Sequence, residues 1–149
     1  MTFRFSLEPV LRLLASYERL ERLRLLALAA MLVRVREEIA AAAREEAAAR
    51  EARKEMLSRG VAVAEIQLGM SAERARARQN RELFDRLAAL ERQHVKQSRI
   101  YQAARRKREV MENLRGRKQR EYRREQDRRT QQVIDELYLL RRANPLQSE

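Results

Sequence analysis

The stretch SRGVAVAEIQLGMSAER, residues 58–74, is the one long interruption in a sequence that otherwise favours helix throughout. Gly60 and Gly69 lower helix propensity, and Ser71 is a residue type that caps the start of a new helix. Proline occurs only at positions 9 and 145, so nothing else between them forces a helix to stop. We therefore expect the chain to reverse here. The predicted elements are a first helix over about residues 6–58, a connection over about 59–71 and a second helix over about 72–142.

The two outer helix ends carry the expected signals. Ser6 can cap the first helix, while Glu8 and Pro9 suit its first turn, where a carboxylate is favoured and a missing N–H is harmless. Asn144 and Pro145 mark the end of the second helix.

Composition argues against a globular core. Of 149 residues, 38% are charged and 5% aromatic, there is no Trp, and Gly occurs three times. Such a chain suits long helices packed along a narrow seam. With no cysteine, disulfides and thiolate sites are excluded. The N-terminal residues lack an apolar run of signal-peptide length, and we expect a cytoplasmic protein.

Apolar side chains recur in steps of three and four, the spacing of a helix–helix seam. The first helix has this stripe at Leu25, Leu28, Leu32, Val35, Ile39 and Ala42, and the second at Leu83, Leu87, Leu90 and His94. Further along the second helix, large apolar residues recur every eleven residues, at Ile100, Met111, Tyr122 and Val133. This spacing favours a straight or slightly right-handed pairing of the helices. The pattern predicts an all-α fold, an antiparallel two-helix coiled-coil hairpin with a longer second helix.

The predicted helices differ in length, at roughly 80 Å and roughly 105 Å for a rise of 1.5 Å per residue. A reversal near residue 65 places residue 58 opposite about residue 72 and residue 7 opposite about residue 123. Most of 124–142 then projects as an overhang, and it shrinks to about ten residues if 60–69 is helical. The overhang carries several large apolar residues, which suit either a receptor or self-association of this helix in a dimer.

A second stretch, RRKREVMENLRGRKQREYRREQDRR at residues 105–129, carries twelve basic and five acidic side chains, over half of the net charge of +12. A basic nucleic-acid-binding coiled coil is one interpretation. However, such a reader needs several zipper heptads directly after its basic segment, and the interleaved carboxylates repel phosphate. We expect this basic block to contact protein, with no nucleic-acid partner.

Four segments together resemble the FliJ-type flagellar export coiled-coil family over essentially the whole chain. They are FRFSLEPVLRLLASYE at the start, LFDRLAALERQHV in midchain, RRKREVMENLRGRKQREY, and DEL at residues 135–137. The resemblance implies a rod-like hairpin similar to a rotary-ATPase central stalk. Its expected partners are the hexameric flagellar export ATPase and the cytoplasmic domain of the export-gate membrane protein. It would be peripheral to the inner membrane at the flagellar base through these partners only. The equivalent stalk of a virulence type III secretion system is the nearest alternative.

Site residues follow from the resemblance and from the overhang. The family's gate-binding stripe is similar to Leu83, Leu87, Leu90 and His94, which could equally be an internal seam. The aromatic residues that the family has on the first helix are missing from EEIAAAAREEAAARE. For ATPase binding we expect Arg120, Arg123, Arg124, Val133, Leu137 and Leu140.

No catalytic constellation is present in the sequence. His94 is the only histidine and has neither cysteine nor a second ligand near it, so it makes no convincing metal site or catalytic base. There is also no Gly-rich phosphate loop and no Ser/His/Asp set. We expect a protein that is not an enzyme and needs no cofactor.

Overall fold

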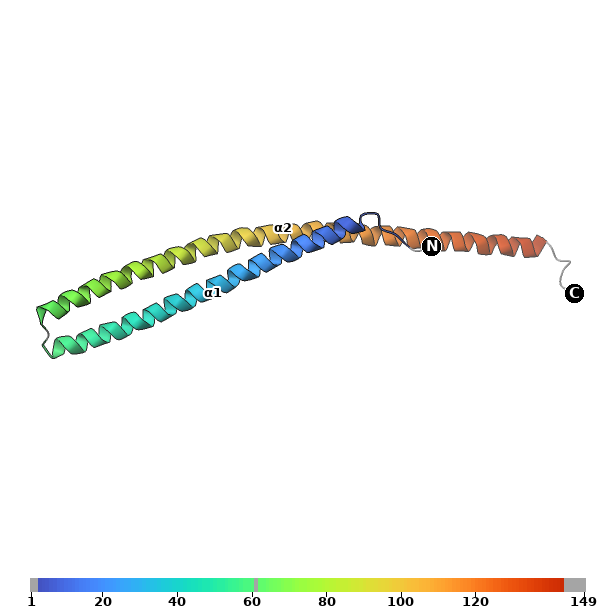
Figure 1. Ribbon diagram of the computed structural model, residues 1–149. Helices are drawn as coiled ribbons and strands as arrows, with labels where there is room; N and C mark the ends of the chain where they lie inside the picture. Colours follow the sequence, from blue (N-terminus) through green and yellow to red (C-terminus); the bar gives the residue numbers. More distant parts are fainter. Residues whose placement is uncertain (1–2, 61, 144–149) are drawn as a thin grey trace. The chain divides into compact units, whose positions relative to one another are not determined.

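A computed structural model describes residues 3–60 and 62–143, and it contains two helices. Helix α1 spans Glu8–Ser58 and helix α2 spans Val63–Ala143, and no strand occurs within the described ranges. The fold is all-α, an antiparallel hairpin with a longer second helix, which confirms the predicted class (Figure 1).

The chain divides into two units, each made of one stretch from either side of the reversal. The first joins the residues up to Glu18 with those from Ala104 onward, and the second is Arg19–Ala103. In the first unit, the Arg115 guanidinium lies 3.4 Å from the Glu8 carboxylate, and Arg108 binds Glu18. In the second, Arg36 and Arg53 form ion pairs with Glu91 at 3.2 Å and Glu73 at 2.8 Å. Within each unit, α1 therefore runs antiparallel to α2.

The reversal depends on Gly60 rather than on the whole interruption. Gly60 has a φ of 78°, in the left-handed region that favours glycine, whereas Gly69 lies inside α2. Ser71 does not cap a helix, because its hydroxyl donates to the Leu68 carbonyl at 2.8 Å within α2. The second helix thus begins at Val63, nine residues before the expected start. An interior glycine costs only about 1 kcal/mol, too little to stop a helix that has a partner.

This early start also changes the pairing register. The expected register placed residue 7 near residue 123 and residue 58 near residue 72. Instead, Glu8 pairs with Arg115 and Arg53 with Glu73, so each α1 position meets a residue nearer the start of α2. Although residues 63–69 are helical, the overhang does not shrink to ten residues, because every residue of 127–142 is exposed.

Burial along the seam follows an alternation of three and four residues on both helices. The predicted α1 stripe lies on this line, where Leu32 is buried and Val35 is fully buried. On α2 the line includes Leu83, Leu87 and Ala104. The buried positions of this region keep the 3.5-residue period of a coiled coil.

Ile100, Met111 and Tyr122 of the eleven-residue series are also half-buried, and the straight or slightly right-handed pairing inferred from that series stays a prediction. Val133, its last member, is exposed.

Candidate protein-interaction surfaces

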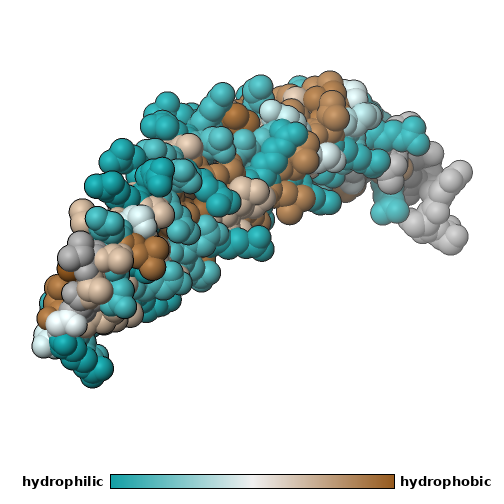
Figure 2. Space-filling view, turned by 60° about the vertical axis from the view of Figure 1, so that its left-hand side comes forward, coloured by the Kyte–Doolittle hydropathy of each residue, from teal (hydrophilic) through white to brown (hydrophobic). Residues whose placement is uncertain are grey.

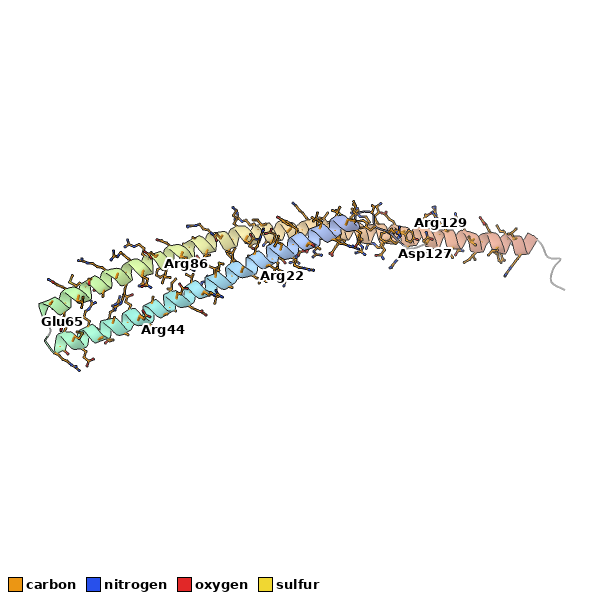
Figure 3. All side chains as sticks on the ribbon, viewed as in Figure 1. Arg22, Arg44, Glu65, Arg86, Asp127 and Arg129 are labelled. Atoms are coloured by element: carbon orange, nitrogen blue, oxygen red, sulfur yellow. The ribbon has the colours of Figure 1, made fainter. Side chains whose placement is uncertain are left out.

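The overhang, residues 127–142, is an exposed apolar surface of the first unit. Asp127 and Arg129 label its start in Figure 3, where α2 continues beyond the first residue of α1. The large apolar side chains are 53 to 65% exposed: Val133, Ile134, Leu137, Tyr138, Leu139 and Leu140. Figure 2 shows apolar surface at this end of the chain, next to the grey terminal residues. The sequence prediction of an exposed apolar overhang is confirmed.

The overhang stripe continues the α1-facing side of α2. Tyr122 and Gln126 are the last half-buried residues on that side, and Val133, Leu137 and Leu140 follow at helical spacing on the same face. At 100° per residue, Ile134 lies about 100° further round, which widens the apolar face beyond a single seam. The overhang is therefore a seam whose partner helix has ended, and it fits a groove better than a flat surface.

Most acidic residues of the basic block are engaged by the block's own cations. Arg105 binds Glu109, Lys118 binds Glu121, and Arg128 and Arg129 bind Glu125. The hydrogen bond from Lys118, at 2.9 Å, lowers the pKa of Glu121. Arg120, Arg123 and Arg124, the predicted ATPase-binding cations, are exposed and form no ion pair within 4.0 Å among the described residues, although the charge of Arg124 also lowers the pKa of Glu121. They are consequently available to an acidic partner.

Arg108 differs from the rest of the block because it faces the seam. Its guanidinium binds Glu18 of α1 and Glu112 of α2, and the Arg108 and Glu18 side chains are 24% and 15% exposed. These two carboxylates, with the Glu18 hydrogen bond contributing most, raise the pKa of Arg108. This member of the basic block therefore holds the hairpin together and is not free for a partner.

The predicted gate-binding stripe lies in the seam. Leu83, Leu87, Leu90 and His94 are all half-buried. On the same side of α2 they lie between Asn80, which donates to Glu46 of α1, and Gln97, which donates to Glu21. None of the four is fully exposed, because the same spacing places them beside α1, and their binding to the gate stays a prediction. The more exposed apolar neighbours are Phe84 and Val95.

Glu21 is a buried charged residue that the sequence does not mark as special. It occupies a seam position and is 1% exposed. The Gln97 side-chain amide donates to its carboxylate and, at 3.2 Å, to its backbone carbonyl, while Arg24 binds the carboxylate at 2.7 Å. Its position, seven residues after Leu14 and four before Leu25, was the available signal. A satisfied polar group in a seam fixes the register of the two helices.

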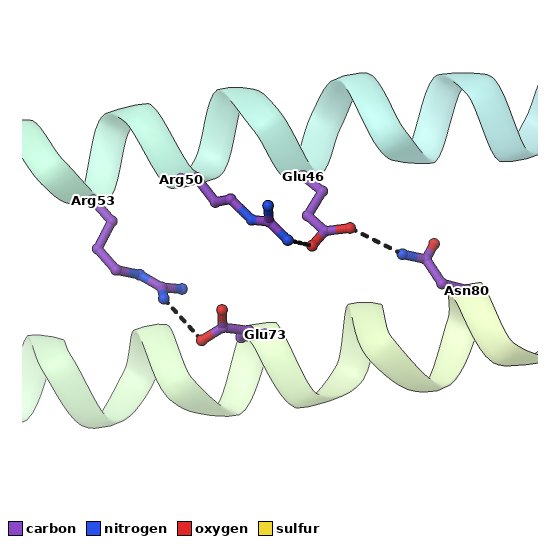
Figure 4. Close-up of polar contacts among 5 residues, drawn as sticks. All are labelled: Glu46, Arg50, Arg53, Glu73 and Asn80. Atoms are coloured by element: carbon purple, nitrogen blue, oxygen red, sulfur yellow. Dashed lines mark hydrogen bonds and ion pairs between the residues drawn. The ribbon is translucent and has the colours of Figure 1, made fainter.

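The end of the hairpin near the turn forms a second apolar surface, within the second unit. Its seam holds polar residues, with Arg53 bound to Glu73 and Glu46 bound by both Arg50 and Asn80 (Figure 4). Beside them lies an open groove of about 620 Å³, called here the tip groove. Its large apolar lining residues are Met56, Leu57, Ile66, Leu68 and Met70, all exposed.

Other kinds of site find no support within the described residues. No cluster of three or more potential metal-ligating side chains occurs among them. No described helix has the length and apolar character needed to cross a membrane. No family model, curated protein or solved structure matches the chain.

Proposed function

We propose that this protein is a non-enzymatic stalk of the bacterial flagellar type III export apparatus, which binds the hexameric export ATPase and couples it to the export gate. The observation that carries the proposal is the overhang. Its apolar face continues the seam of α2 without a partner helix, and six large apolar side chains there are more than half exposed. In water such a surface is costly unless a receptor covers it.

Charge supports a protein socket over nucleic acid. The basic block neutralises most of its own carboxylates along the helix, and Arg108 is held in the seam. The remaining exposed arginines next to the overhang would steer the stalk toward an acidic ring entrance, a contribution to association rate more than to affinity. The overhang would then provide the buried contact inside the ring.

Coupling to the gate would be mechanical. A helix pair that is held at one end can transmit a change at the ATPase to a second contact elsewhere on the hairpin. The gate contact stays a prediction for the region of Leu83 to His94, but its half-buried stripe could reach a partner only at its edges.

The test is binding to the purified flagellar export ATPase, scored for ring assembly and stimulation of ATP hydrolysis. Leu137→Asp should abolish both, because it places a charge on the apolar face of the overhang. Leu13→Asp is the matched control, since Leu13 is equally apolar and 69% exposed but lies on α1. Equal loss with both variants, or no stimulation by the wild type, would refute the proposal.

A second experiment tests the contribution of the exposed arginines separately from that of the apolar overhang. Reversing the charge of Arg120, Arg123 and Arg124 should slow association and leave helix content unchanged. Stimulation of the ATPase from a virulence secretion system, but not of the flagellar one, would favour that alternative. A steep loss of DNA binding with salt, in the absence of ATPase binding, would favour a nucleic-acid role.

A further inference from the structure

The tip groove is poorly covered by the two helices that form it. Where α1 and α2 meet near the turn, the groove has small residues such as Ala52 and Gly69 on its lining, while Met56 and Leu68 are 48% and 73% exposed. Small residues let another helix approach closely, and methionine adapts to the shape of a partner. The groove therefore has the form of a receptor for an apolar helix.

The charged residues around the groove indicate which charges the docked helix should carry. Arg53 is bound to Glu73, but Arg76, which also lines the groove, is half-buried and has no ion-pair partner among the described residues. Arg74 and Arg78 are exposed on the same part of α2 and likewise have no described partner. Glu65 is the only carboxylate among the residues that line the groove. An apolar helix with carboxylates at its edge would satisfy these arginines.

The overhang of the same sequence fits this description. Residues 133–140, VIDELYLL, combine exposed apolar side chains with Asp135 and Glu136. Asp135 accepts a hydrogen bond from Gln131 within its own helix, and both carboxylates are exposed. At 1.5 Å per residue this segment is about 11 Å long, which fits along the α2 side of the groove, residues 65–76, at about 17 Å.

We propose that residues 133–140 of one copy dock into the tip groove of a second copy. The overhang and the α2 side of the groove lie on the same helix, with helical residues 77–132 between them, and we assign the contact to two separate molecules. Each copy then offers one free overhang and one free groove, which makes the association head-to-tail and able to repeat. This self-association would cover the overhang while no other receptor is bound, and the two kinds of binding would compete.

The contact is small. A helix of about two turns buries less than the roughly 1,000 Å² of a stable interface. The association should accordingly be weak and should disappear on dilution. The full chain is the probe, and its mass is followed by sedimentation over a hundredfold range of protein concentration.

Two blocked variants make the geometry testable. Leu68→Asp blocks the groove and Leu137→Asp blocks the overhang, and both positions are exposed, so the fold should survive, as circular dichroism would show. Each variant alone should be monomeric at every concentration. Mixed together, they should form a 1:1 dimer, because one supplies the intact overhang and the other the intact groove. Leu13→Asp should associate like the wild type.

Other outcomes overturn the proposal in distinguishable ways. If the wild type stays monomeric at every protein concentration, the proposed self-association does not occur. If Leu68→Asp still associates and Leu137→Asp does not, the overhang pairs with something other than the groove, and loss in Leu13→Asp would identify α1. If self-association fails while Leu137→Asp still abolishes ATPase stimulation, the proposed function stands without it. Binding to anionic vesicles that depends on Leu68 and Arg76, in a monomeric wild type, would assign the groove to a lipid surface.

Discussion

The ring of Phe3 lies against the ring of Tyr122, with centroids 5.7 Å apart and planes tilted by 50°. Phe3 precedes α1, so the segment before the helix extends the pairing along α2. Beyond this contact, burial ends within about a helical turn, and all of 127–142 is exposed. The Phe3–Tyr122 contact therefore marks the boundary between the paired hairpin and the overhang.

Hydrogen exchange should reveal this boundary. In dilute, monomeric protein the amides of 130–142 should exchange much faster than those of 83–111, because only the latter have a packed partner helix. Deleting residues 130–149 should leave the cooperative unfolding of the hairpin intact. Strong protection of Leu137 and Leu140 in a monomer would contradict the exposed overhang.

Leu87 distinguishes a seam from an exposed stripe. Leu87→Ala should lower the free energy of unfolding by about 1–3 kcal/mol, less than at a fully buried leucine because Leu87 is half-buried. Phe84→Ala, at a 55% exposed neighbour, should cost less than about 0.5 kcal/mol. Urea unfolding of both variants measures this. If Leu87→Ala instead weakened gate binding at unchanged stability, the seam interpretation would fail.

Glu21 should contribute to specificity more than to stability. Glu21→Ala removes the carboxylate acceptor of the Gln97 amide and leaves it only the backbone carbonyl, which should destabilise the hairpin by about 1–3 kcal/mol. Replacing both residues by leucine should be neutral or stabilising, by up to about 4 kcal/mol, since an apolar pair removes the desolvation cost. Thermal unfolding tests the ranking, and a double variant less stable than Glu21→Ala would show that the polar pair itself stabilises the seam.

Lys118 should control the titration of Glu121. Because the folded-state pKa of Glu121 is lowered by the Lys118 hydrogen bond, the associated stabilisation is full above the unfolded pKa and is lost as pH falls through the folded pKa. Lys118→Gln should raise the Glu121 pKa, as followed by carboxyl ¹³C NMR. Lys107→Gln should not, since Lys107 is not among the groups that shift this pKa. An unchanged Glu121 titration in Lys118→Gln would exclude the contact in solution.

The hairpin and its overhang were predictable because they depend on strong, repeated signals. Absent prolines, a glycine near the midpoint and apolar steps of three and four leave few alternatives for the chain. The start of α2 was not predictable to the same degree. Gly69 and Ser71 have the chemistry of a break, but packing against α1 outweighs a propensity cost of about 1 kcal/mol.

The surfaces were harder to predict than the fold. The spacing of Leu83, Leu87 and Leu90 indicates that one side of α2 is apolar. However, a seam between two helices and an exposed binding stripe have the same spacing. Glu21 could not be recognised as a seam residue, because a carboxylate among leucines looks like a solvent-exposed position in the sequence. Its burial becomes clear only from its hydrogen bond with Gln97 on the other helix. The tip groove needs both helices together, so no single stretch of sequence indicates it.

The buried Glu21–Gln97 pair and the turn at Gly60 together limit how the gene can change length. If one codon is gained in either helix between the Glu21–Gln97 pair and the turn, the side chains on the far side of the insertion turn by about 100° about the helix axis. Glu21 and Gln97 then no longer face each other. Only gains of seven codons, matched in both arms, keep the leucines facing each other and the carboxylate beside its amide. Descendants of this gene should thus differ in hairpin length by paired heptads, whereas the unpaired end of α2 can lengthen freely, one residue at a time.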